Sequence, residues 1–238
     1  MMVSVYRTPP ERCSGGVAVV IDVLRWSSAV VAALAGGAAG VEAFATADAA
    51  RLRASAIGAL LAGERETHRI AGFDLGNSPL EFTRERVAGR VICATTTNGT
   101  RALASVADVP VVFVAGFVNL AATAAYVREL LARDGGRDLR HVHIICAGSA
   151  GQPSAEDSLC ADWLAAALRT GAPGRSTDTP RHAAHPDDAR AALAELARSA
   201  PHANTLRAAG YAEDVAFALR LDAIPLVAAL RDGRIVAV

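Results

Sequence analysis

The first clear hydrophobic signal in the chain is residues 16–24, GVAVVIDVL, a nearly unbroken apolar run rich in β-branched side chains. A strand that is covered on both faces needs such a run, because neither face meets water. Residues 27–34 suit a helix that stops at Gly36 and Gly37, since glycine commonly follows the last turn of a helix. The chain therefore begins with a strand, a tight turn and a helix.

Later segments repeat this alternation. The pattern predicts strands at 41–45, 87–94, 111–115 and 141–148, and helices at 47–61, near Thr100, at 119–133 and at 154–169. Alternating strands and helices of these lengths favour parallel pairing with helices on both faces of the sheet. We therefore predict an α/β fold, a three-layer α/β/α sandwich with a mainly parallel sheet.

The C-terminal part of the chain has a different pattern. Residues 171–186 are rich in Gly, Pro, Ser, Thr and Asp, which indicates a surface loop suited to a mobile lid or an insertion, and two or three helices follow. The last residues form two β-rich runs around Asp232-Gly233, a type I′ hairpin signal. We expect this antiparallel hairpin at the edge of the sheet. Residues 1–238 form a single domain in this interpretation, with 135–145 as the place where it could divide.

Composition narrows the partners and the chemistry. The 24 basic and 24 acidic residues cancel, so no basic field favours nucleic acid. Every basic residue is arginine, and a chain without lysine has neither a Schiff-base lysine for pyridoxal chemistry nor a Walker A lysine for a nucleotide. The apolar content of 52% is enough for a sizeable core and permits a homodimer.

The four cysteines form no CxxC pair, and we interpret them as reduced thiols. The N-terminal residues lack the apolar core of a signal peptide, and the longest uncharged run, 26–41, is too short to cross a membrane. We therefore expect a cytoplasmic protein that binds no membrane.

Polar residues follow several of the predicted strands. In an open α/β sheet the ligand binds beyond the carboxyl ends of the strands, so these residues are the candidates for a site. They are Asp22 and Arg25 after the first strand; Asp74, Asn77 and Ser78 in the loop 72–79; Thr96, Thr97, Asn98, Gly99, Thr100 and Arg101 in the stretch ATTTNGTRAL; and Gly148, Ser154, Glu156 and Asp157 after the strand at 141–148.

These residue types suit a cation and an anion together. The carboxylates of Asp22, Asp74, Glu156 and Asp157 offer the hard oxygens that Mg²⁺ accepts. The guanidinium groups of Arg25 and Arg101 match phosphate or sulfonate oxygens. The turn of Asn98, Gly99 and Thr100 leads into a helix and would present backbone N–H groups to an anion.

The motifs IDVLR, GFDLGNSPLEF, ATTTNGTRAL and CAGSAGQPSAEDSLCA, in this order and spacing, resemble the 2-phosphosulfolactate phosphatase family, known as ComB. The resemblance covers nearly the whole chain, because residues 201–227 also resemble the C-terminal segment of the family. It implies a magnesium-dependent phosphatase acting on a small 2-phospho acid, the sulfolactate step of coenzyme M biosynthesis. The sequence departs from the family at Trp26-Ser27-Ser28, where Ala-Thr/Ser-Thr is usual, and an indole beside Arg25 could reshape the acid-binding end of the site.

Charge neutralisation is the main task of such a site, because the oxygens of a phosphate monoester repel a nucleophile. We predict Mg²⁺ on Asp22, Glu156 and Asp157, and catalytic roles for Asp22, Arg25, Asp74 and Arg101. The substrate would contact Asn77, Ser78, Thr96, Thr97, Asn98, Gly99, Thr100, Gly148 and Ser154. Attack by water and attack by Asp22 both stay open, and Leu24 argues against the haloacid-dehalogenase pattern, which has a second aspartate there.

Structural roles remain alternatives for several of these residues. Asp22 could cap the following helix, Ser154 and Asp157 could form a capping box, and Asn77-Ser78-Pro79 could be only a turn. The hydroxyls near Thr95 could bond the backbone instead. At the level of function, the alternative is an anion-binding member of the family without catalysis, whereas a kinase is disfavoured because the chain has no lysine.

The histidines give weaker signals. His141 and His143 lie on one strand face, as zinc ligands can, but no third ligand has a matching spacing. His182 and His185 fall in the polar loop and are expected to be solvated.

Overall fold

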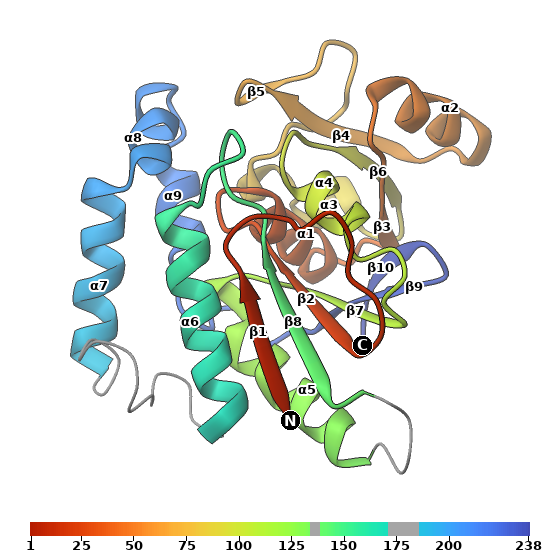
Figure 1. Cartoon of the computed structure of the whole chain (residues 1–238). Coiled ribbons are helices and arrows are strands. Elements are labelled where there is room, and N and C mark those ends of the chain that lie inside the picture. The colour runs from red at the N-terminus through yellow and green to blue at the C-terminus, as the bar shows by residue number, and fades with distance from the viewer. Residues whose placement is uncertain (134–138, 171–185) are drawn as a thin grey trace.

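The computed structural model describes residues 1–133, 139–170 and 186–238. Within them, one sheet holds ten strands in the order β1-β8-β2-β7-β9-β10-β3-β6-β4-β5 (Figure 1). Of the predicted loop 171–186, only the last residue is described, so His182 and His185 lie outside the described residues. Residues 135–138 of the segment 135–145 also lie outside them. The strands are β1 (Met2–Tyr6), β2 (Val17–Ile21), β3 (Gly40–Ala43), β4 (Leu60–Arg65), β5 (His68–Arg69), β6 (Val91–Thr95), β7 (Val111–Ala115), β8 (His141–Cys146), β9 (Ala228–Arg231) and β10 (Arg234–Ala237).

Two groups of parallel strands make up most of the sheet. The strands β1, β8, β2 and β7 are parallel to one another, and so are β3, β6 and β4. The antiparallel hairpin of β9 and β10 lies between the groups, pairing with β7 on one side and β3 on the other. Its turn has φ of 49° at Asp232 and 79° at Gly233, which confirms the type I′ prediction. The expected edge position was wrong, since the hairpin joins the two groups in the interior of the sheet.

Helices cover both faces of this sheet, which confirms the α/β/α sandwich. On one face, α5 and α6 pack on β2, β7 and β8, with α7 to α9 beside them. On the other, α1 packs on both strand groups. Helix α2 packs on the face of β6 opposite to α1, because Ile92 and Ala94 contact the α1 cluster whereas Cys93 contacts Ala50 and Ala54. The α-helices are α1 (Trp26–Ala35), α2 (Ala47–Ile57), α3 (Arg84–Val87), α4 (Gly99–Ala104), α5 (Leu120–Arg133), α6 (Ala155–Thr170), α7 (Pro186–Ser199), α8 (Pro201–Ala208) and α9 (Ala212–Ala218), with 3₁₀ turns at Pro79–Glu81 and Phe117–Asn119.

Helix α1 is the centre of the second core. All its residues from Trp26 to Leu34 are buried, and its apolar side chains form one cluster with residues of β2 and β7 and with residues of β3 and β6. A helix buried on every side needs small and apolar residues all round, which explains its alanines and valines. The sheet must curl around this helix, because strands of both groups contact it.

Twist and curl bring the carboxyl ends of the two groups together. Three antiparallel pairings in succession make the groups run in opposite directions. Five strand pairings separate β2 from β6, and at roughly 20–25° each they accumulate a twist of roughly 100–125°. In Figure 1, β8 accordingly stands upright while β4 lies across the top of the view. The carboxyl ends of β2 and β8 therefore face those of β4 and β6.

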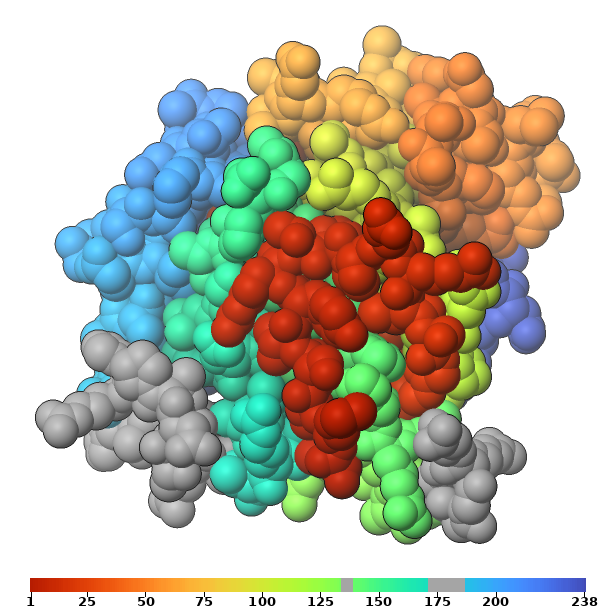
Figure 2. Space-filling model, viewed as in Figure 1, coloured from red at the N-terminus to blue at the C-terminus, as the bar shows by residue number. Residues whose placement is uncertain are grey.

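Two predicted boundaries differ from the structure by four residues each. The helix predicted at 47–61 ends at Ile57, because Gly58 has a φ of 67° and closes the helix, and Leu60–Arg65 forms strand β4. The strand predicted from residue 87 begins at Val91, since Arg84–Val87 is a helical turn. Strand β1 was not predicted; it belongs to the N-terminal stretch of the chain, red in Figure 2, which lies on the face in view. No helix in the described ranges is long and apolar enough to cross a membrane.

Candidate active site

The facing carboxyl ends enclose a cleft of about 350 Å³. It is lined by residues that follow β2, β4, β6 and β8, together with residues of α8. Asp22, Arg25, Asn77, Thr96, Thr97 and Asn98, which the sequence singles out, all lie in this lining. Six of the residues that were predicted from their positions after the strands therefore line one cleft.

Asp22 leaves β2 at the floor of this cleft and is only 5% exposed. Its backbone N–H donates to Ser27 Oγ at 2.9 Å, which ties the strand end to the first turn of α1. Burial raises the pKa of Asp22 to about 7, with further increases from the negative charges of Glu64 and Glu156, partly offset by the Trp26 backbone N–H and the Arg25 charge. Burial and the neighbouring negative charges thus disfavour the ionised form of Asp22, which a nearby cation would stabilise.

Glu156 and Asp157 begin helix α6 and are almost completely buried. Asp157 Oδ1 accepts from the Val23 backbone N–H at 2.8 Å, and Oδ2 accepts from the Gly148 backbone N–H at 3.0 Å. Burial, then the charges of Asp22 and Glu156, raise the pKa of Asp157 well above its usual range. Asp157 therefore ties the ends of β2 and β8 together, and both of its oxygens face donors of the chain itself.

Glu156 has one occupied oxygen and one without a partner. Its Oε1 lies 3.2 Å from Nδ1 of His202, a cleft residue on α8 that the sequence analysis did not single out. Its Oε2 is buried and has no hydrogen-bond partner among the described residues. A buried carboxylate oxygen in that state is costly and marks a place where a cation or a donor would bind.

Glu64 is an acidic cleft residue that was missed. Its Oε1 accepts from the backbone N–H of Thr97 at 3.0 Å and from the Thr97 hydroxyl at 3.1 Å, and Oε2 accepts from the Thr67 backbone N–H at 3.0 Å. It comes from β4, whose first two residues were predicted as the end of a helix and whose other residues were given no element. The donors of Thr97 that we expected to face the substrate are therefore held by Glu64 in this structure.

Arg25 is fixed from three sides. Its Nη1 donates to Asp214 Oδ2 at 2.7 Å, its Nη2 donates to the Thr67 carbonyl at 2.7 Å, and its guanidinium lies 4.1 Å above the Tyr211 ring centroid. Asp214 also accepts from the Ser78 hydroxyl at 2.6 Å. Asp214 and Tyr211 belong to the stretch 201–227 that carries the family resemblance, but no pattern assigned a role to either residue.

The other predicted residues lie behind or beside the cleft. The Thr100 hydroxyl donates to the Thr96 carbonyl at 2.7 Å, Ser154 Oγ accepts from the Asp157 backbone N–H at 3.3 Å, and Gly99 packs against Trp26. Gly148 has a φ of 67°, and a Cβ there would lie 2.4 Å from the Gln152 carbonyl oxygen. Their contacts organise the backbone around the cleft.

Asp74 and Arg101 lie outside the cleft lining. Asp74 is exposed, and its Oδ2 accepts from the Leu61 backbone N–H at 2.8 Å, which anchors the start of β4. Arg101 is exposed on α4 and lines a separate cavity with Thr8 and Gly151. The structure does not bring these two residues to the other predicted catalytic groups.

Metal ligation by histidine finds no support in the geometry. Ring centroids of His141 and His143 are 3.9 Å apart, and His141 Nε2 lies 2.8 Å from Ser4 Oγ. Within the described ranges, no three or more His, Cys, Asp or Glu side chains are grouped so that they could hold a metal ion, and this includes the predicted trio of Asp22, Glu156 and Asp157. Any cation in the cleft would therefore complete its shell with water or substrate oxygens.

Comparison of the sequence with known proteins identifies its family. A family model described as 2-phosphosulpholactate phosphatase matches residues 3–233. This chain belongs to the 2-phosphosulfolactate phosphatase family. A Gloeobacter violaceus protein named probable 2-phosphosulfolactate phosphatase is 37% identical over 231 residues, 94% of this chain and 93% of that protein. Proteins of the same name are 34% identical over 98% of this chain and 96% of the relative in Thermotoga petrophila, and 41% identical over 69% and 67% in Synechococcus.

Membership of the 2-phosphosulfolactate phosphatase family confirms the resemblance seen in the motifs. The matched residues include the end of β2, the end of β4 and the turn after β6, which line the cleft. Phosphoric monoester hydrolysis is the reaction class of the family.

Proposed function

We propose that this chain hydrolyses the phosphate monoester of a small 2-phospho acid with the help of Mg²⁺, and that 2-phosphosulfolactate is converted to sulfolactate and phosphate. One observation carries the proposal: Asp22 and Glu64 line the same cleft as Thr96 and Asn98 of the anion-binding turn. Carboxylates facing an anion repel it unless a cation lies between them. Relatives named for this reaction support the choice of substrate.

The residues present fit Mg²⁺. Mg²⁺ is commonly held by one or two carboxylates, with waters and substrate phosphate completing its shell, so a complete protein cage is not needed. Asp22 and the free Oε2 of Glu156 supply two such oxygens, and Asp157 lies beside them in the first turn of α6. Mg²⁺ bound there would neutralise phosphoryl charge and lower the pKa of a bound water.

The chain's own side chains position the substrate. Asn77 and Asn98 provide amide groups along one wall, and Arg25 provides a fixed cation at the other end of the acid. Hydrolysis breaks the ester P–O bond and forms a P–O bond to the water oxygen, and the released alkoxide receives the proton that the attacking water loses. Holding Arg25 rigidly lowers the entropic cost of orienting the substrate.

Phosphate release from a panel of small 2-phospho acids, including 2-phosphosulfolactate and 2-phospholactate, tests this proposal. We expect Asp22→Asn to lower kcat/KM by at least about 100-fold, since a metal ion contributes several kcal/mol to the transition state. Asp48→Asn is the matched control, because the Asp48 side chain is 94% exposed on α2. Equal activity of wild type and Asp22→Asn would contradict the proposed role of Asp22.

Release from none of these acids, with binding of them retained, would contradict catalysis itself. The cleft would then belong to an anion-binding relative of the family. Release that does not depend on Mg²⁺ would keep the phosphatase and remove the cation from the proposal.

A further inference from the structure

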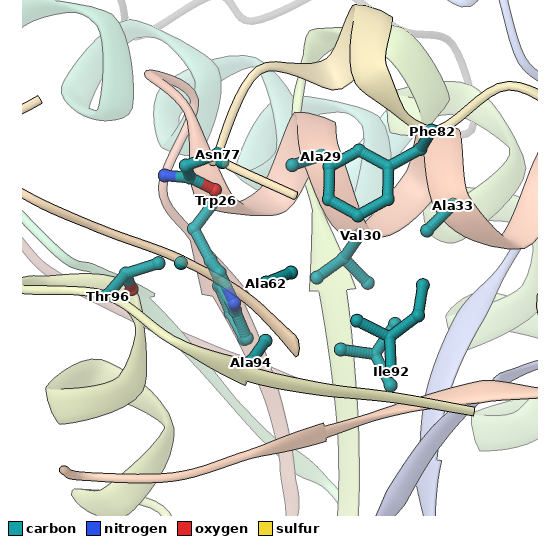
Figure 3. A pocket seen from close by; sticks show the side chains of 13 residues that line it. Trp26, Ala29, Val30, Ala33, Ala62, Asn77, Phe82, Ile92, Ala94 and Thr96 are labelled. Atoms are coloured by element: carbon teal, nitrogen blue, oxygen red, sulfur yellow. The ribbon is translucent and has the colours of Figure 1, made fainter. Parts of the chain in front are cut away.

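A second, much smaller cavity lies between α1, β4 and β6, next to the cleft (Figure 3). Its lining is mainly apolar, with Val30, Ile92 and Phe82 among its side chains. It offers about 10 Å³ to the centre of a water molecule, and roughly 10–15 Å³ is the least that one water needs. Asn77 and Thr96 line both spaces, so the cavity adjoins the wall of the cleft.

Two polar atoms of the residues around this cavity are buried without a partner. Neither Trp26 Nε1 nor Thr96 Oγ1 has a hydrogen bond to any described residue, and the two residues are 1% and 4% exposed. The indole N–H can only donate, whereas a hydroxyl donates and accepts. A water within hydrogen-bond distance of both atoms would satisfy both, and buried waters are commonly found where protein polar groups lack partners.

Trp26 also contacts the other end of the turn that contains Thr96. A Cβ added to Gly99 would lie 2.6 Å from Cδ2 and Cε3 of the indole, so the ring lies directly against the Gly99 backbone. Figure 3 shows the indole between Thr96 on one side and Val30 and Ile92 on the other. The ring thus lies under the turn from Thr96 to Gly99, which forms one wall of the cleft.

We propose that one water in this cavity bridges Trp26 Nε1 and Thr96 Oγ1, and that Trp26 is a positioning residue for the turn from Thr96 to Gly99. The ring holds Gly99, and the water holds the Thr96 side chain. Trp26 itself is covered by these residues and acts on the substrate through them. The kinetic consequence rests on the proposed phosphatase activity, whereas the water does not.

A crystal structure of the full chain tests the water directly. We expect one ordered water within hydrogen-bond distance of both Trp26 Nε1 and Thr96 Oγ1 in the wild type and in Thr96→Ser, which keeps the hydroxyl. An empty cavity, or a direct bond from the indole N–H to a protein acceptor, would overturn the proposal. This result is independent of any activity.

Steady-state kinetics test the positioning role. We expect Trp26→Phe and Thr96→Val each to raise KM for the hydrolysed acid about 5-fold, the equivalent of one neutral hydrogen bond, with a smaller change in kcat. Thr96→Ser should retain the wild-type KM. The double variant should be no worse than either single variant, because both substitutions remove the same bridge. Effects on KM that multiply in the double variant would contradict a shared water.

Ile92→Val is the matched control, because it removes one methyl group from the same cavity and no polar atom. We expect Ile92→Val to lower stability without changing KM. A KM change equal to that of Trp26→Phe would show that loosened packing, and not loss of the water bridge, causes the effect of Trp26→Phe. Absence of phosphate release in the wild type would contradict the proposed function, while the crystal structure would still decide whether the water is present.

Discussion

The ion pair of Arg25 and Asp214 is the most deeply buried pair of opposite charges that we find in the cleft wall. Their side chains are 3% and 4% exposed, and Nη1 lies 2.7 Å from Oδ2. Removing two charges from water is costly, so such a pair persists only where the remaining donors and acceptors are also satisfied. Ser78 and Thr67 supply those contacts here, which links residues far apart in the chain.

Asp214→Ala should be strongly destabilising, because it leaves the buried Arg25 without its counterion. We expect the free energy of unfolding to fall by about 3–5 kcal/mol in urea titrations. Glu213→Ala is the control, since Glu213 is the exposed neighbour of Asp214 on α9. A loss of similar size in the two variants would contradict this account of the pair.

Residues at strand ends were the part of the site that the sequence could reveal. Asp22, Thr96 and Asn98 follow strands of clear apolar pattern, and residues at the carboxyl ends of such strands are the usual ligand-binding positions in an α/β sheet. Asp214 and His202 reach the cleft from helices near the C-terminus, whose packing depends on long-range contacts. Local patterns carry no information on such contacts, so these residues could not be assigned.

At the scale of elements, one misplaced boundary concealed a residue of the site. The apolar pattern of α2 continues into residues 60–61 in the sequence, yet Gly58 adopts a left-handed conformation and ends the helix. The following residues pair with β6 as strand β4, which delivers Glu64 to the cleft. A glycine between two apolar runs was the available signal for that boundary.

Glu42 joins three elements and gives the structure a dependence on pH. Arg53 of α2 donates to its Oε2 at 2.8 Å, and Arg234 of β10 donates to its Oε1 at 2.7 Å. The hydrogen bond from Arg53, and then that from Arg234, lower the pKa of Glu42 despite its burial. Because the folded-state pKa is below the unfolded value, this stabilisation is present above about pH 4.3 and is lost as the pH falls through the folded value.

Glu42→Gln should therefore lower the free energy of unfolding at pH 7 by about 1–2 kcal/mol, as expected for hydrogen bonds to a charged group. The difference from wild type should shrink in urea titrations at progressively lower pH, below the ordinary glutamate pKa. Glu129→Gln is the control, because Glu129 forms an exposed pair with Arg133 on α5. A difference that stays constant down to pH 3 would contradict the ionised pairing of Glu42.

At the scale of the whole molecule, the C-terminal hairpin joins the two parallel strand groups. A hairpin signal in the sequence indicates two antiparallel strands but not their neighbours, which explains why the edge position was predicted. The observed pairings place β9 against β7 and β10 against β3. The last residues of the chain therefore complete the sheet that brings the carboxyl ends of β2 and β6 together.

Deletion of residues 227–238 should abolish cooperative folding, because it leaves the open edges of β7 and β3 without partners. We expect no sigmoidal unfolding transition by circular dichroism, together with aggregation. Removal of Val238 alone is the control, since β10 ends at Ala237. Cooperative unfolding of the truncated chain at the wild-type midpoint would show that the hairpin is dispensable.

The most direct test of the proposed cation-assisted phosphatase is phosphate release from 2-phosphosulfolactate by the wild-type chain, first in excess chelator and then with Mg²⁺ restored. We predict no release in chelator and full recovery with Mg²⁺, because Asp22 and Glu156 otherwise present uncompensated negative charge near the phosphate. Equal release under both conditions would contradict the role of the cation, and absence of release under both would contradict the assigned reaction.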